Sequence, residues 1–560
     1  MTRRIVRTAL QLALLTSLLF ISVWLLDSRY RVLPQTIHNH LPIHHPGLVV
    51  TDVVVRTCRF GACAVDPSWS RVDKDLYLGS AWITKAYVDV QRKREQDLTP
   101  TDRVVVDVRV GRLNPAASDP PAKDEKWESR QAGLWVKRSA RRSDSDSARA
   151  VTAVDVLFGA DAVDPRPGWE MKDRPLVDGG GAIGPRITIR RGTPAKVEKV
   201  VPRVRKDGKF KILQVSDLHL STGVGVCRDP VPANGKCEAD PRTLEFVGRI
   251  LDTEKPDFVV LSGDQVNGET APDSQTAILK FAELFISRKI PYATIPGNHD
   301  DEGSLTRAAS TELLTTLPYS LTEAGPNTIP GVGNYYIQVL AHSGHHAALT
   351  LYFLDTHAYS PDEKKYHGYD WIKPEQIRWF KDTARALKAD NAKYSHIHLD
   401  MAFIHIPLPE YRDGGKLVGE RREGVTAPAY NSGFRDALVD VGVPVVSCGH
   451  DHANDYCLLS EPDTAGGKKD AAKRAEPDLA EGGEEAVKPK HTRNDKIWMC
   501  YAGGSGFGGY GGYGGYVRRV RVFELDAHEA RISTWKRVEW GDTERRVDEQ
   551  VIVDGGRVVG

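Results

Sequence analysis

Apolar residues follow different spacings in the two halves of the chain. Between residues 48 and 200 they gather in short β-branched runs, as at 49–55 and 103–110, which predict strands. From residue 209 onward such runs alternate with stretches of helical spacing, as at 276–288. The first half therefore predicts a small, mostly β domain. The second predicts an α/β (α+β layered) domain whose strands end in polar loops.

The uncharged run from Thr8 to Leu26 differs from both halves. As a helix rising ~1.5 Å per residue, it is long enough to cross most of the ~30 Å hydrocarbon core of a bilayer. It follows Arg3, Arg4 and Arg7, and no Ala-x-Ala cleavage site comes after it. We therefore predict a single-pass membrane protein with an uncleaved signal anchor, cleavage being the alternative. The basic residues before the span favour a lumenal or extracellular body.

Two further segments have the composition of connections. The stretch from about 114 to 150 is rich in Pro, Ser and charge, which predicts a mobile loop. Residues 461–495 are charged and of low complexity, which predicts a disordered insertion. The predicted organisation is a cytosolic stub (1–7), a transmembrane signal anchor (8–26), a stalk (27–47), the β-rich domain (48–200), the α/β domain (205–525) and a C-terminal tail (526–560).

An aspartate and a histidine follow one apolar run of the α/β domain. Asp217 and His219 come just after residues 211–215. On an extended backbone, side chains two residues apart point to the same side, so we expect this carboxylate and imidazole to project together. An oxygen and a nitrogen ligand on a rigid strand end suit a divalent metal, although the pattern alone also fits an ordinary polar strand end.

Four later apolar runs end in a similar way. They supply oxygen and nitrogen donors without cysteine, a set that suits Fe, Mn or Zn. The donors are Asp264 after Gly263, Asn298, His299 and Asp300 after Gly297, His405 before Pro407, and His450 with His452 after Gly449. His396 and His398, just upstream, are the alternative to His405, and His357 is a candidate for the substrate side of the site. The pattern predicts a centre that binds divalent or trivalent metal.

These five blocks, in this order, resemble those of the calcineurin-like metallophosphoesterases. The resemblance spans roughly residues 205–525 and implies a β-sandwich flanked by helices that hydrolyses phosphoric esters. It assigns Asp217, His219, Asp264 and His452 to one metal, and Asp264, Asn298, His405 and His450 to the other, with Asp264 bridging. It also implies that His299 is the general acid and that Asp300 orients it. Two cations ~3.5–4 Å apart can hold a hydroxide between them and clamp the phosphoryl oxygens.

Some segments narrow this resemblance to the fungal and plant branch related to purple acid phosphatases. That branch includes membrane-anchored fungal phosphatases of the dosage-dependent cell-cycle-regulator type. The segments are 404–411, 449–456, 503–516 and 74–79 with Trp82. Purple enzymes carry a tyrosine ligand three residues after the bridging aspartate. This chain has Asn267 there, so we expect no tyrosinate-to-iron colour. The glycines of 503–516 either let the backbone approach a ligand closely or form a flexible turn.

Composition limits the remaining possibilities. The net charge of +1 gives no bulk field that would attract nucleic acid. Seven cysteines in 560 residues do not make a disulfide scaffold, although Cys58/Cys63 and Cys227/Cys237 are close enough to be bridged in an oxidising compartment. We predict hydrolysis of a phosphomonoester, with a phosphoprotein as the expected substrate. A phosphodiesterase acting on a nucleotide or lipid headgroup is the alternative, and a catalytically inactive, membrane-tethered binding protein is the second.

Overall fold

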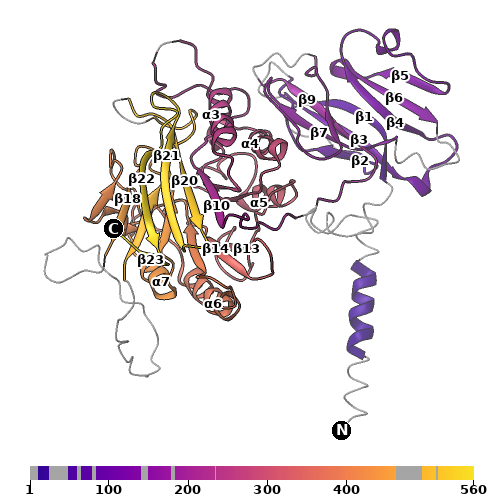
Figure 1. Cartoon of the computed structure of the whole chain (residues 1–560). Coiled ribbons are helices and arrows are strands. Elements are labelled where there is room, and N and C mark those ends of the chain that lie inside the picture. Colours follow the sequence, from indigo (N-terminus) through magenta and orange to yellow (C-terminus); the bar gives the residue numbers. More distant parts are fainter. Residues whose placement is uncertain are drawn as a thin grey trace. The chain divides into compact units, whose positions relative to one another are not determined.

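The computed structural model forms two compact units (Figure 1). Unit 1 comprises Met1–Asp73, Ala81–Asp155 and Ile189–Pro194, and unit 2 comprises Lys74–Ser80, Val156–Thr188 and Ala195–Gly560. The residues described are 11–23, 48–59, 65–78, 84–140, 149–177, 183–197, 199–233, 235–461, 495–511 and 515–560.

The N-terminal segment contains one described helix, at residues 11–23. Within the described ranges, no helix has both the length and the apolar character that a membrane span requires. The predicted stub and stalk, both ends of the predicted anchor, and nearly all of the predicted insertion lie outside the described residues. The transmembrane anchor therefore stays a prediction.

Unit 1 is built from short antiparallel strands. One sheet has the order β1 (Leu48–Arg59), β3 (Thr84–Arg94), β2 (Trp69–Val72), and another β4 (Arg103–Val110), β6 (Leu134–Ala140), β5 (Glu125–Ser129). A third sheet, with the order β7 (Val151–Phe158), β9 (Pro185–Arg191), β8 (Trp169–Met171), is not confined to unit 1, because β8 and most of β9 fall within the residues of unit 2. Single 3-10 turns lie at Glu95–Asp97, Pro115–Ala117 and Gln131–Gly133. The β-branched runs at 49–55 and 103–110 thus form strands, as predicted.

The prediction of a mobile loop from about 114 to 150 is wrong for residues 114–140, because β5 and β6 lie there, and residues 141–148 are outside the described part of the chain. Trp127, Leu134 and Val136 are buried, and they alternate with polar or half-exposed neighbours along the two strands. A strand that is buried on only one face needs few apolar residues. The average composition of the segment therefore did not reveal that buried and exposed residues alternate along these two strands.

Unit 2 is organised around two seven-stranded mixed sheets. The first has the order β12 (Tyr292–Ile295), β11 (Phe258–Ser262), β10 (Lys209–Val215), β20 (Arg519–Asp526), β21 (Arg531–Val538), β22 (Val547–Asp554), β23 (Arg557–Val558). The second has the order β13 (Tyr335–Leu340), β14 (Ala347–Phe353), β15 (Leu399–Phe403), β17 (Val445–Cys448), β19 (Ile497–Tyr501), β18 (Cys457–Ser460), β16 (Lys416–Val418). β10, β11 and β12 are parallel, as are β14, β15, β17 and β19.

The two sheets share an apolar core and carry helices on their other faces (Figure 1). Between the sheets, Phe403 contacts Phe523 across 6.3 Å between ring centroids. The helices are α3 (Ala239–Glu254), α4 (Ser274–Arg288), α5 (Arg307–Thr315), α6 (Pro374–Asn391) and α7 (Phe434–Val441), with 3-10 turns at Gly268–Thr270 and Pro409–Arg412. α3 and α4 pack with the first sheet, and α6 and α7 with the second. The predicted sandwich flanked by helices is confirmed.

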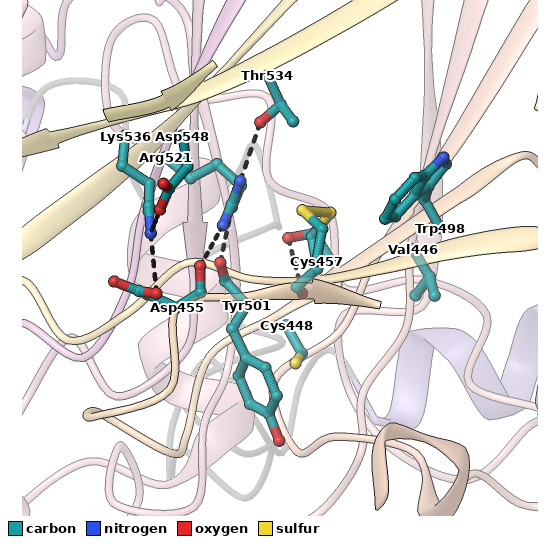
Figure 2. Close-up of a disulfide and its surroundings, with 12 residues drawn as sticks. Val446, Cys448, Asp455, Cys457, Trp498, Tyr501, Arg521, Thr534, Lys536 and Asp548 are labelled. Atoms are coloured by element: carbon teal, nitrogen blue, oxygen red, sulfur yellow. Dashed lines mark hydrogen bonds and ion pairs between the residues drawn. A yellow bond between two sulfur atoms is a disulfide. The ribbon is translucent and has the colours of Figure 1, made fainter. Parts of the chain in front are cut away.

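Residues 526–560 were predicted as a tail, yet they contribute β21, β22 and β23. Figure 2 shows how charged side chains of β20, β21 and β22 gather at Asp455, just before β18 of the second sheet. Lys536 contacts Asp455 at 2.8 Å and also pairs with Asp548, and Arg521 donates to the Asp455 carbonyl oxygen at 2.6 Å. Lys536 and Arg521 are each 1% exposed, so these pairings are needed to offset the loss of water. The C-terminal residues are therefore an integral part of unit 2.

Two disulfides lie in unit 2. The possible Cys227–Cys237 bridge is present. A second bridge, Cys457–Cys500, joins residues that face each other on antiparallel β18 and β19, and its sequence separation of 43 gave no local signal (Figure 2). Cys448 is buried and free.

Candidate metal centre

Three predicted ligands gather where β10 and β17 end. Ligand atoms of Asp217, His219 and His452 all lie within 4.8 Å of one another, and all three side chains are buried. The Nε2 atoms of His219 and His452 are 3.1 Å apart, and His452 Nε2 is 3.5 Å from Asp217 Oδ1. Two imidazole nitrogens and a carboxylate oxygen therefore converge on one point. We call these three residues group 1.

A second group lies at the ends of β11, β12, β15 and β17. Ligand atoms of Asp264, His405 and His450 also lie within 4.8 Å of one another. His405 Nε2 is 3.2 Å from Asp264 Oδ2 and 3.2 Å from Asn298 Oδ1. The Nδ2 atom of Asn298 is buried without a hydrogen-bond partner. These four residues form group 2.

Asp264 lies between the two groups. Its Oδ2 atom, 3.2 Å from His405 Nε2 in group 2, is also 3.7 Å from His219 Nε2 in group 1. The carboxylate of Asp217 approaches the same region, because it accepts from the His450 backbone N–H at 3.1 Å. The position predicted for a bridging ligand is thus held by a carboxylate that faces both groups.

The ligands leave their strands through strained turns. Asp217, His219, Asp264 and His450 all have positive φ, between 47° and 76°. β10 ends at Val215, so the expectation that Asp217 and His219 share a side through strand alternation is wrong. A left-handed backbone costs residues other than glycine about 1–3 kcal/mol, and such strain persists where the surrounding structure over-determines it. His405 likewise lies two residues beyond β15, which ends at Phe403.

Backbone carbonyls fix the tautomers of two histidines. His405 Nδ1 donates to the Ser262 carbonyl at 2.8 Å, and His452 Nδ1 donates to the Tyr510 carbonyl at 2.8 Å. In the neutral form of each ring, Nε2 therefore carries the lone pair, and this atom points into the site. A carbonyl behind a ligating histidine is the usual way in which a protein orients such a ring.

The electrostatics of the site favour a cation. Burial lowers the pKa of His219 to about 3 and that of His450 to about 3, so both rings are neutral at physiological pH. Burial also lowers the pKa of His405, but the neighbouring Asp264 carboxylate overcomes this effect and raises it to about 9. Neutral imidazoles and ionised carboxylates are the forms that bind metals, so a metal ion beside Asp264 would displace the proton from His405. The donor set therefore fits two metal ions.

Asp300 and His299 have other partners than the sequence implied. Both oxygens of Asp300 accept backbone N–H groups, from Gly297 at 2.7 Å, Asp264 at 3.0 Å and Val266 at 2.9 Å. His299 Nδ1 instead lies 2.6 Å from Glu302 Oε2. The carboxylate that orients His299 is therefore Glu302, and Asp300 shapes the turn that carries Asn298. The sequence analysis missed Glu302 because it lies three residues beyond His299, after a turn, and belongs to no recognisable motif.

The glycine-rich segment 503–511 packs against the ligands, which decides between its two interpretations. A Cβ atom on Gly509 would lie 2.6 Å from His452 Cε1 and 2.9 Å from His219 Cγ, and still closer to His219 Cδ2. One on Gly506 would lie 2.7 Å from Leu218 Cα, and one on Gly508 would overlap the His219 carbonyl. The run needs glycine because its backbone passes directly over the metal-site loops.

Tyr510, within this segment, is a residue that the sequence analysis missed. Its ring stacks on His452 with centroids 3.9 Å apart and planes 6° apart. Its hydroxyl accepts from the His452 backbone N–H at 2.9 Å and donates to Glu423 Oε1 at 3.0 Å. Tyr510 thus holds His452 from one face, through both its ring and its carbonyl.

His398, an alternative ligand, and His357, a candidate for the substrate side, lie outside both ligand groups. His398 Nδ1 is 2.8 Å from the Ala347 carbonyl, at the start of β14, and His357 Nε2 is 2.8 Å from Gln376 Oε1. Neither belongs to the two ligand groups. The preference for His405 over its upstream neighbours therefore agrees with the geometry.

Comparison with known proteins points to one family. The family model described as calcineurin-like phosphoesterase matches residues 210–454. Phosphatase DCR2 of Saccharomyces cerevisiae is 41% identical over 424 residues, which cover 72% of this chain and 67% of that protein. An uncharacterised protein of Schizosaccharomyces pombe is 31% identical, with 87% of this chain and 85% of that protein covered. Probable inactive purple acid phosphatase 14 of Arabidopsis thaliana is 33% identical, with 62% and 83% covered.

Proposed function

The chain belongs to the calcineurin-like phosphoesterases, and on that premise we propose that it hydrolyses phosphomonoesters at two adjacent metal positions. The observation that carries this proposal is the position of Asp264, whose Oδ2 faces His219 at 3.7 Å and His405 at 3.2 Å. One carboxylate shared by two groups of ligands is what a site for two close cations requires.

The side chains present fit Fe, Mn or Zn, because the donors are imidazole nitrogen, carboxylate and amide oxygen without thiolate. Group 1 would hold one ion and group 2 the other, with Asp264 shared. When bound, the two ions would supply a water of lowered pKa and would neutralise charge on the phosphoryl oxygens.

His299 is positioned to give a proton to the leaving group. Its side chain is 32% exposed, and its ring centroid lies 5.3 Å from that of His219. Glu302 engages Nδ1, so Nε2 is the atom from which a proton can be transferred. Burial lowers the pKa of His299, but Asp264 and Glu302 outweigh burial and raise it, which keeps the ring protonated to higher pH.

The reaction balances without any further reactant. The oxygen of water bonds to phosphorus, the bond from phosphorus to the ester oxygen breaks, and that oxygen takes the proton from His299 Nε2. The products are an alcohol and phosphate. The ring of His299 recovers its proton from solvent, which its exposed position permits.

A phosphoprotein is our proposed substrate class, in preference to a nucleotide or lipid phosphodiester. Support comes from the exposure of the proton donor, since His299 and Glu302 stand at the surface while the ligand groups lie buried beneath them. A phosphorylated side chain on the surface of another protein can reach such a donor.

The test uses the full-length chain, Asp264→Asn and His299→Ala, assayed with added Mn²⁺ or with chelator. We expect activity to require metal and Asp264→Asn to lose both metal and activity. His299→Ala should keep its metal and lose about 10²–10⁴ in rate on glycerol 2-phosphate. On p-nitrophenyl phosphate the loss should be smaller, because p-nitrophenolate leaves readily without a proton.

Two outcomes would contradict the proposal. Hydrolysis of bis-p-nitrophenyl phosphate without hydrolysis of monoesters would assign the site to phosphodiesters. A chain that binds no metal would instead be a binding protein, in line with the word "inactive" in the name of the Arabidopsis relative.

We also propose that the region after residue 26 is lumenal or extracellular, with the N-terminus anchored in a membrane. The Cys227–Cys237 and Cys457–Cys500 bridges support this location, because disulfides persist in oxidising compartments. In sealed vesicles the region should resist protease until detergent is added, and digestion without detergent would place it on the cytosolic side.

A further inference from the structure

Two tyrosines form a rigid pair beside the metal centre. Tyr359 and Tyr369 face each other across an antiparallel bridge, and the Ser360 N–H donates to the Gly368 carbonyl at 2.9 Å to close the hairpin. The two rings stack with centroids 5.7 Å apart and planes 23° apart. The backbone therefore fixes the rings side by side, so no side-chain order has to be gained when a ligand arrives.

This pair reaches from a ligand group to the proton donor. The ring of Tyr369 lies edge-on to that of His450 in group 2, with centroids 4.4 Å apart. The hydroxyl of Tyr359 donates to Glu302 Oε1 at 3.0 Å, while Oε2 of the same carboxylate lies 2.6 Å from His299 Nδ1. The tyrosines thus border the side of the site at which the ester oxygen must leave.

Tyr359 is largely open to solvent. The residue is 53% exposed and its hydroxyl is already paired with Glu302, so the ring is the part of the side chain left to contact a ligand. Single exposed aromatic residues are common and need no explanation. Here a second aromatic ring backs the first one, and Trp371, Tyr366 and Tyr430 form a separate aromatic cluster with centroids 4.7–5.3 Å apart.

We propose that Tyr359 and Tyr369 form a subsite for a planar aromatic ring carried by the leaving group of the substrate. The inference rests on the proposed phosphomonoesterase activity. A phosphate between the two ligand groups and His299 directs its ester oxygen toward His299, and the group attached to that oxygen then falls over Tyr359. Ring stacking favours such a ligand by about three- to tenfold over a ring-free one of similar area.

Two substitutions at Tyr359 separate stacking from the hydrogen bond to Glu302. Tyr359→Phe and Tyr359→Leu both lack the hydroxyl, so both lose that hydrogen bond equally, but only the second also lacks the ring. The full-length variants are assayed with Mn²⁺ on phenyl phosphate and on glycerol 2-phosphate. Tyr336→Leu is the matched control, because Tyr336 is exposed to 37% but lies on β13 and outside the site.

We expect the preference for phenyl phosphate, as the ratio of the two kcat/KM values, to fall about three- to tenfold in Tyr359→Leu relative to Tyr359→Phe. Tyr336→Leu should leave the ratio at its wild-type value. Equal ratios in the Leu and Phe variants would overturn the subsite, because the ring would then contribute nothing to recognition.

The ring could come from a tyrosyl side chain or from a nucleoside, and two further substrates distinguish these sources. If kcat/KM for phosphotyrosine falls in Tyr359→Leu relative to Tyr359→Phe, the ring belongs to a tyrosyl side chain. If kcat/KM for a nucleoside 5′-monophosphate falls in the same way, the ring belongs to a nucleotide. If the wild-type chain hydrolyses no monoester, the proposed function has failed, and binding of phenylphosphonate against methylphosphonate to the metal-loaded chain still decides the subsite. Tighter binding of the phenyl compound that survives in Tyr359→Phe and disappears in Tyr359→Leu supports it, and equal binding of the two compounds refutes it.

Discussion

The close approach of the glycine-rich segment to the metal site predicts a large effect from one added methyl group. In Gly509→Ala, the new Cβ would lie 2.6 Å from His452 Cε1, about 1 Å short of the ~3.5 Å at which carbon atoms attract most. The φ of Gly509 is not positive, so alanine meets no backbone strain there and the whole effect is steric. Either the segment or the two histidine rings must move by about that distance.

A displacement of ~1 Å in a reacting geometry can cost about 10²-fold in rate, and overpacking a well-filled core costs about 1–3 kcal/mol in stability. We therefore expect Gly509→Ala to lose roughly two orders of magnitude in kcat/KM and part of its bound metal. The measurements are hydrolysis of p-nitrophenyl phosphate with saturating Mn²⁺, metal content by mass spectrometry, and the melting temperature.

Gly414→Ala is the matched control, because a Cβ at Gly414 would meet nothing within 4 Å and its φ is not positive either. That variant should behave as the wild type does. If Gly509→Ala kept kcat/KM and metal content within twofold of Gly414→Ala, the claim that this segment positions the ligands would be refuted.

Two more outcomes follow from the geometry. In Glu302→Gln the pKa of His299 loses one of the charges that raise it, so the fall of kcat/KM at alkaline pH should begin at lower pH than in the wild type, as a pH profile would show. An unmoved alkaline limb would contradict the pairing of Glu302 with His299. Replacing both Cys457 and Cys500 by alanine opens a loop with a sequence separation of 43, which should lower the free energy of unfolding by about 4 kcal/mol in a denaturant titration. An unchanged midpoint would show that pairing of β18 with β19 suffices.

Local sequence was enough to predict the positions of the ligands along the chain. Each donor follows or interrupts an apolar run, and at Asp264, Asn298 and His450 a glycine comes one residue before it. A buried strand followed by a turn is set by neighbouring residues, so it is readable without the fold. The same locality explains why β10 and α4 lie within a few residues of where they were expected.

Long-range packing decided the rest. The order of strands in the two sheets brings Asp217 and His452 together, although 235 positions separate them in the chain. No local pattern records that proximity. The role of the glycine-rich segment depends on the His219 and His452 rings beneath it, and its composition alone fitted a flexible turn equally well. Tyr510 contacts His452 through a carbonyl and a ring face, neither of which has a sequence signature.

The sequence by itself thus determined which side chains are available for chemistry and which strand each of them follows. Only the tertiary structure decided which carboxylate orients His299, because hydrogen bonding between loops depends on distances that no periodicity encodes. It also decided that residues 526–560 belong to the core, since Lys536 of β21 is buried in an ion pair with Asp455, a residue distant in sequence. Short-range patterns record local backbone preference, whereas a metal site is a property of several chain segments meeting at one point.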